Sequence, residues 1–132
     1  MPASSQEKPA ITEQTTPEFR RDLERLSAEE QASVLATLRH SYELLRNNRR
    51  EFFAKTLRPV PIHLKGGLNS SLYALRVGRD IRLVLAVDDD PVFGQVLVTL
   101  FRAVHHNEVD RSYRSVANLL YRNQVERNGG AR

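Results

Sequence analysis

Apolar and polar residues alternate most clearly along one stretch, LYALRVGRDIRLVLAVDDDPVFGQVLVTLFRAVHHNE, which runs from Leu72 to Glu108. Three runs rich in Val, Leu, Ile and Phe, as in strands, are separated by turn-forming residues at 77–80 and 88–91. We therefore expect strands over about 72–77, 81–87 and 92–102. The last run is apolar on both faces, which is typical of a central strand that is covered on both sides.

The first turn also predicts a register. A three-residue loop, 78–80, places Leu75 opposite Leu83 on an apolar face and Arg76 opposite Arg82 on the other face. A two-residue loop would pair Arg82 with Leu75 and mix the two faces, so the apolar pattern argues against it. Like charges that face each other across two strands repel. We therefore expect an anion to lie between Arg76 and Arg82.

Helical patterns precede and follow these strands. After a weak strand pattern at 10–15, Thr16 and Pro17 are typical of a helix start, and Ser27 with Glu30 forms a capping box for a second helix that ends near Arg46. The connection between these two helices is short, which predicts an antiparallel helical hairpin. We expect residues 47–71 to be irregular and a final helix to open at 107–110. The predicted class is α+β: an N-terminal helical hairpin packed on a small, mainly antiparallel sheet, with a C-terminal helix.

The length of 132 residues indicates one domain. We place it at 11–122, between mobile tails at 1–10 and 123–132. The chain has no cysteine, no apolar run of the roughly 20 residues that span a bilayer, and no signal-peptide pattern, so we expect a cytoplasmic protein that does not enter a membrane. Its histidines lack partners at metal-ligand spacing, so we expect no metal and no cofactor.

Positive charge is concentrated in one part of the chain. The net charge is +4, but residues 49–82 contain eight Lys or Arg and only two acidic residues, Glu51 and Asp80. Such a surplus attracts polyanions, above all nucleic acid. From charge alone, a solvated basic surface without a partner is an equally good interpretation.

The ordered set of motifs resembles the RelE/ParE toxins of bacterial type II toxin–antitoxin pairs. The resemblance covers about residues 11–122 and is carried by the opening at 16–26, HLKG at 63–66, LRVGRDIRLVL at 75–85, VDDD at 87–90 and HHNEV at 105–109. It implies a small α/β domain and a cognate antitoxin protein as partner. RelE-type members cut mRNA in the ribosomal A site without a metal, whereas ParE-type members inhibit DNA gyrase.

The resemblance also implies site residues. Arg76 matches the position of a catalytic lysine, Arg82 matches an arginine that contacts the scissile phosphate, and His105 and His106 fall where nucleases carry a general acid or a phosphate-binding group. Lys65 matches a basic position in the loop before the sheet. The remaining predicted RNA-binding residues are Arg58, His63, Arg79 and Arg102.

These residue types suit metal-free RNA cleavage, in which the 2′-hydroxyl attacks the phosphate. Arginine offers a planar fork to phosphate oxygens, and histidine, with an ordinary pKa of about 6.5, suits proton transfer. We assign the phosphate to Arg82, the developing charge to Arg76 and the acid to His105 or His106; the general base stays open. A second family lysine is Ala74 here, and a tyrosine is Asp110. These departures leave two alternatives, a gyrase inhibitor of the ParE type and a degenerate member that only binds its antitoxin or nucleic acid.

Overall fold

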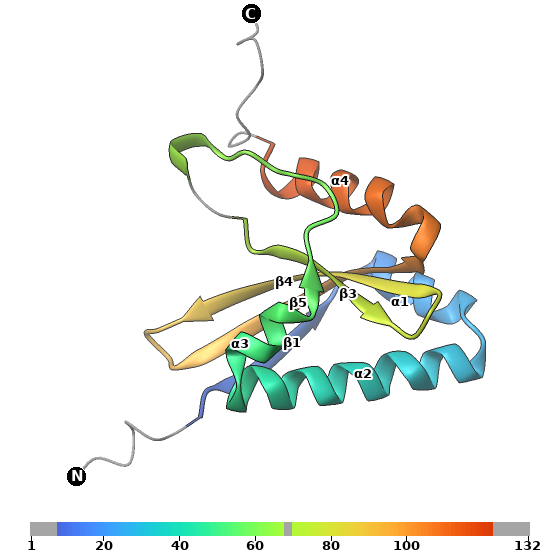
Figure 1. The fold of residues 1–132 in the computed structure, drawn as a ribbon, viewed down its shortest axis with the longest axis horizontal. Helices are drawn as coiled ribbons and strands as arrows, with labels where there is room; N and C mark the ends of the chain where they lie inside the picture. The colour runs from blue at the N-terminus through green and yellow to red at the C-terminus, as the bar shows by residue number, and fades with distance from the viewer. Residues whose placement is uncertain (1–7, 68–69, 123–132) are drawn as a thin grey trace, which may run out of the picture.

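The computed structural model describes residues 8–67 and 70–122, which form an α+β fold with a five-stranded mixed sheet (Figure 1). The strand order is β1-β5-β4-β3-β2. The strands are β1 (Ala10–Thr15), β2 (Thr56–Leu57), β3 (Leu72–Val77), β4 (Ile81–Asp90) and β5 (Gln95–His105). The helices are α1 (Pro17–Arg25), α2 (Ala28–Asn47), α3 (Arg49–Ala54) and α4 (Val109–Leu120), with short 3-10 turns η2 (Lys65–Gly67) and η3 (His106–Glu108). Only β1 and β5 pair in parallel within this described sheet.

Helices cover the sheet on its two faces, with α2 below and α4 above in the view of Figure 1. The larger core joins the first three helices to alternate strand residues such as Leu75, Leu83 and Val98. A smaller core lies under α4, around Tyr113, Leu72 and Val84. Strand alternation places neighbouring residues in different cores. Each strand residue can therefore be assigned to the α2 face or the α4 face.

The predicted helix starts are confirmed. The Thr16 hydroxyl accepts a hydrogen bond from the Phe19 N–H at 3.0 Å, with Pro17 at the first helical position. Ser27 and Glu30 satisfy each other's backbone N–H groups, as a capping box requires. Two successive helices are thus present, and their antiparallel arrangement as a hairpin stays a prediction.

The predicted register of the first β-hairpin is confirmed residue by residue. Leu75 lies opposite Leu83, Val77 opposite Ile81 and Arg76 opposite Arg82. Gly78 has a φ of 59°, a conformation that costs a residue with a Cβ about 1–2 kcal/mol and that closes the three-residue turn. The apolar pattern excludes a shift of one residue, which would turn an arginine toward the core, and the three-residue turn completes the register.

The prediction for the second hairpin was wrong by three residues. β4 continues through Asp88 and Asp89 to Asp90, the turn occupies 91–94, and β5 runs to His105 rather than to 102. Asp88 and Asp89 are exposed, so water solvates their carboxylates while their backbone still pairs with β5. Aspartate is typical of turns, but it is tolerated at the end of a strand that extends beyond the core.

The segment 47–71 is not irregular as predicted. It contains α3, whose start is capped by the Asn48 side chain, and the two-residue strand β2, which pairs Thr56 with Leu75. Phe52 in α3 is 2% exposed and belongs to the larger core. Elements this short carry too little periodicity to be found by pattern, because one turn of helix shows only one or two core residues.

Candidate nucleic-acid interface

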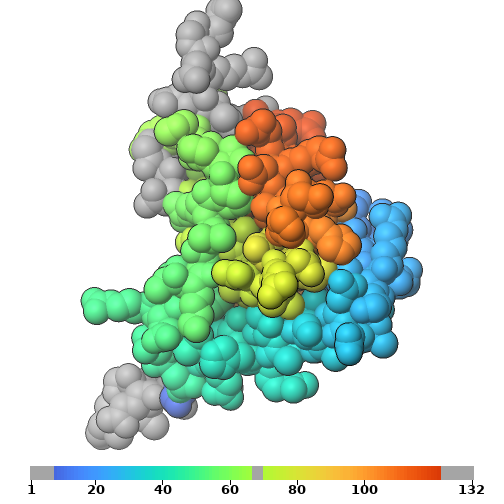
Figure 2. Space-filling view, turned by 45° about the vertical axis from the view of Figure 1, so that its right-hand side comes forward, coloured from blue at the N-terminus to red at the C-terminus, as the bar shows by residue number. Residues whose placement is uncertain are grey.

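Arg76 and Arg82 lie at the turn end of the β3–β4 hairpin. Their positions are directly opposite each other, on the sheet face that also carries Val84 and Ala86 under α4. Arg76 is exposed and Arg82 is half-buried. Figure 2 shows the hairpin (yellow) at the surface, bordered by α4 (orange), α2 (cyan) and the segment after α3 (green). The two cations therefore reach solvent at the place where three elements meet.

Backbone carbonyls of the turn hold the two guanidinium groups. Arg76 Nε donates to the Gly78 carbonyl at 3.1 Å, and Arg82 Nη1 donates to the carbonyls of Arg79 and Ile81 at 3.2 and 2.9 Å. Neither arginine takes part in an ion pair among residues 8–67 and 70–122. Each guanidinium has five N–H donors, so several remain for a ligand. The guanidinium groups are thus fixed in place without being neutralised.

The two predicted histidines occupy different surroundings. His105 lies opposite Ile81 on the α2 face, and its Nε2 is 3.9 Å from a carboxylate oxygen of Glu30. His106 is in η3, and its backbone N–H donates to the Asp80 carbonyl at 2.7 Å. The backbone of His106 is therefore tied to the arginine-bearing turn, whereas His105 lies across the sheet from the face of Arg76 and Arg82.

Arg102 is held in a structural ion pair. Its Nε and Nη2 donate to the two carboxylate oxygens of Asp22 at 2.6 and 3.1 Å, and the Ala103 N–H donates to the same carboxylate at 2.9 Å. The hydrogen bond to Asp22 raises the pKa of Arg102 above its ordinary value. This network attaches α1 to β5, and no local pattern predicts it because the partners are eighty positions apart.

The other predicted RNA-binding residues lie on several segments. Arg58 donates to the Ser70 carbonyl at 2.7 Å and its guanidinium lies 4.8 Å from the centre of the Tyr73 ring, near the start of β3. His63 and Lys65 are exposed between β2 and β3, and Lys65 is the first residue of η2. Arg79 is exposed at the tip of the hairpin, beside Arg76 and Arg82 in sequence. The structure thus brings Arg76, Arg79, Arg82 and His106 together at one turn, and it places Arg58 and Arg102 in structural contacts elsewhere.

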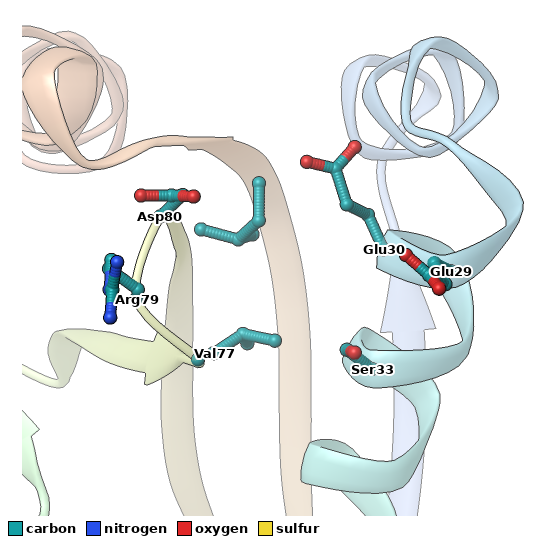
Figure 3. Close-up of a pocket in the computed structure, with 8 residues that line it drawn as sticks. Glu29, Glu30, Ser33, Val77, Arg79 and Asp80 are labelled. Atoms are coloured by element: carbon teal, nitrogen blue, oxygen red, sulfur yellow. The ribbon is translucent and has the colours of Figure 1, made fainter.

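A cavity of about 200 Å³ lies between this turn and the start of α2 (Figure 3). Its α2 wall carries Glu29 and Glu30, and Val77 points into it from β3, while the Arg79 side chain points away from it. The carboxylates make this cavity unsuitable for an anion. An anionic ligand would approach the turn from the side to which Arg79 points.

Two further properties concern metal binding and membrane crossing. Within 8–67 and 70–122, no three His, Asp or Glu side chains gather closely enough to hold a metal ion. None of the helices in that part of the chain has the length and apolar character that crossing a membrane requires.

Comparisons with known proteins find similarity to solved structures alone. No protein-family model matches the chain, and no curated protein matches it. One chain of the crystal structure of the toxin–antitoxin complex RelBE2 from Mycobacterium tuberculosis is 22% identical, with a TM-score of 0.43. The match covers 72% of this chain and 96% of that chain. A superposition of this quality carries no argument about function, which has to come from the residues and geometry above.

Proposed function

We propose that this chain is the toxin of a type II toxin–antitoxin pair and cleaves mRNA on the ribosome. The observation that carries the proposal is the pair Arg76 and Arg82. They lie opposite each other on β3 and β4 at one turn, the first exposed and the second half-buried, and neither has a carboxylate partner among the described residues. The residue motifs at 63–66, 75–85 and 105–109 support the same assignment.

The proposed roles follow from the geometry of the turn. Arg82, held by two backbone carbonyls, binds the scissile phosphate through its remaining donors, and Arg76 adds positive charge on the opposite strand. Preorganised charge of this kind is worth about 3–4 kcal/mol of transition-state stabilisation per well-placed donor. His106 is the better placed of the two histidines to protonate the leaving oxygen, because its backbone is bonded to the arginine-bearing turn. A cognate antitoxin is the proposed protein partner.

A gyrase inhibitor of the ParE type is the second candidate, and one observation favours it. Ala74 is 1% exposed, so the place of the second family lysine is closed and uncharged. A nuclease built on this turn therefore works with fewer cations than the resemblance implies.

One experiment separates the two candidates. The purified chain is added to a translation reaction, in which primer extension maps cuts in the mRNA, and in parallel to a gyrase supercoiling reaction. The proposal expects cuts only when ribosomes are translating the message and expects no effect on supercoiling. Inhibited supercoiling with intact mRNA would overturn it in favour of the second candidate.

A further inference from the structure

A second basic site lies around the edge of β3, on the side of α2. Its centre is a groove of about 530 Å³ between α2 and the turn end of β3. β2 pairs with β3 only at Ala74 and Leu75, so its pairing stops before Arg76. The groove therefore opens where the sheet edge is no longer covered by a neighbouring strand.

Three basic side chains from three elements line this groove. They are His40 of α2, Lys55 at the C-terminal end of α3, and Arg76 of β3. The hydroxyl-bearing residues Thr37 and Ser41 of α2 line the same wall, and Ser41 is otherwise buried at 5% exposure. Ammonium, guanidinium and hydroxyl groups are the usual protein donors to phosphate oxygens.

The charge of this groove distinguishes it from other cavities of the described chain. None of its lining residues is acidic. Carboxylates line three other cavities among the described residues, with Glu30 and Asp80 in one, Asp110 in another, and Asp22 and Glu108 in a third. His40, Lys55 and Arg76 also take no part in an ion pair within 8–67 and 70–122. The cations Lys55 and Arg76, which lie in a concave site without counter-charges, are stabilised when an anion enters.

Arg76 connects this groove with the candidate interface. Its position is opposite Arg82, yet its Nε is bonded to the Gly78 carbonyl, and Arg76 and Gly78 line the groove together. An RNA strand with one phosphate at Arg82 would reach the groove by passing over the edge of β3.

We propose that the groove formed by His40, Lys55 and Arg76 binds a second phosphate of the RNA strand, next to the phosphate at Arg82. The proposal rests on the proposed function for the identity of the ligand. It adds His40 and Lys55 to the interface, residues that the sequence pattern did not single out.

The test is a binding titration with a single-stranded RNA that carries 2′-O-methyl groups throughout and so resists cleavage. In the double variant His40→Gln/Lys55→Gln we expect the affinity to fall roughly tenfold, since charge-assisted hydrogen bonds are lost. We also expect the slope of log affinity against log salt to lessen by about 0.7, the value for one phosphate contact on a single strand. The matched control is Arg39→Gln/Arg46→Gln, which removes two exposed cations of α2 that do not line the groove.

Two outcomes would overturn the proposal. The first is a double variant that keeps the wild-type affinity and salt slope, or that changes no more than the control. The second is that adenosine 5′-monophosphate binds the groove as tightly as the RNA does, as judged by shifts of the amide resonances of 37–41, because the ligand would then be a free nucleotide. Since the RNA cannot be cut, a failure of the nuclease assignment leaves this measurement unchanged. Intact binding without any mRNA cleavage would count against the proposed function alone.

Discussion

The ion pair between Asp22 and Arg102 offers the sharpest test of how α1 is attached to the sheet. The Asp22 side chain is 6% exposed and accepts three hydrogen bonds, two from Arg102 and one from the Ala103 N–H. The substitution Asp22→Ala removes all three and leaves a buried N–H and a guanidinium without their partner.

The size of the effect follows from these contacts. Removing one partner of a buried ion pair costs about 3–5 kcal/mol, and a buried donor left unsatisfied costs about 1–3 kcal/mol. The Arg102 side chain is 30% exposed, so water replaces part of what it loses. We therefore expect Asp22→Ala to lower the free energy of unfolding by about 3 kcal/mol, the low end of the range for a buried ion pair.

Urea unfolding followed by circular dichroism measures this loss. With a slope of about 1.5–2 kcal/mol/M, the midpoint should fall by about 1.5–2 M. The isosteric Asp22→Asn should lose less, because its amide oxygen can still accept from the Ala103 N–H. The control Glu18→Ala breaks the exposed pair with Arg21 at 3.6 Å, and should cost less than about 0.5 kcal/mol. A loss in Asp22→Ala no larger than in Glu18→Ala would refute the reasoning.

Three further predictions concern two turns, a buried phenol and an exposed apolar side chain. Gly78→Ala and Gly94→Ala should each lower the free energy of unfolding by about 1–2 kcal/mol, because both glycines have positive φ (59° and 62°). Only Gly78→Ala should also weaken RNA binding, and equal losses of binding in the two variants would contradict an RNA site at the β3–β4 turn. Burial raises the pKa of Tyr113, so the unfolded chain loses its phenol proton before the folded protein does; stability should be full below pH 10.0 and fall above it. In melting curves recorded over a series of pH values, the loss of stability should be shallower in Tyr113→Phe than in wild type. An identical loss in the two proteins would show that Tyr113 is not its source. Phe93→Ser, at a site 78% exposed, should change the unfolding free energy by less than about 0.5 kcal/mol in urea, and a larger loss would show a packing role.

The parts of the fold that local patterns specify could be predicted from the sequence. The register of the β3–β4 hairpin follows from apolar alternation together with a three-residue turn, since a shift of one residue would turn Arg76 or Arg82 toward the core. The starts of α1 and α2 follow from side-chain caps that act within three residues. In each case the interaction that decides the structure lies within a few positions along the chain.

The parts that depend on distant contacts could not be predicted. Asp90 looks like a turn residue in sequence, but its strand continues because β5 pairs with it. Arg102 looks like a free cation until Asp22 of α1 is placed beside it. His105 and Arg82 lie on opposite faces of the sheet because of a β-bulge in the pairing of β4 with β5, next to Val84 and Leu85. No local pattern of residues predicts this bulge.

The rate of mRNA cleavage by Arg82→Ala tests the central proposal most directly. Wild type, Arg82→Ala and the control Arg21→Ala are each added in excess to ribosomes stalled on a defined message, and the cut product is followed over one turnover. Loss of a charged donor to the developing negative charge should slow cleavage by about 10²–10³-fold in Arg82→Ala, while Arg21→Ala, an exposed arginine of α1 far from the turn in sequence, should match wild type. Cleavage by Arg82→Ala at the wild-type rate would contradict the account.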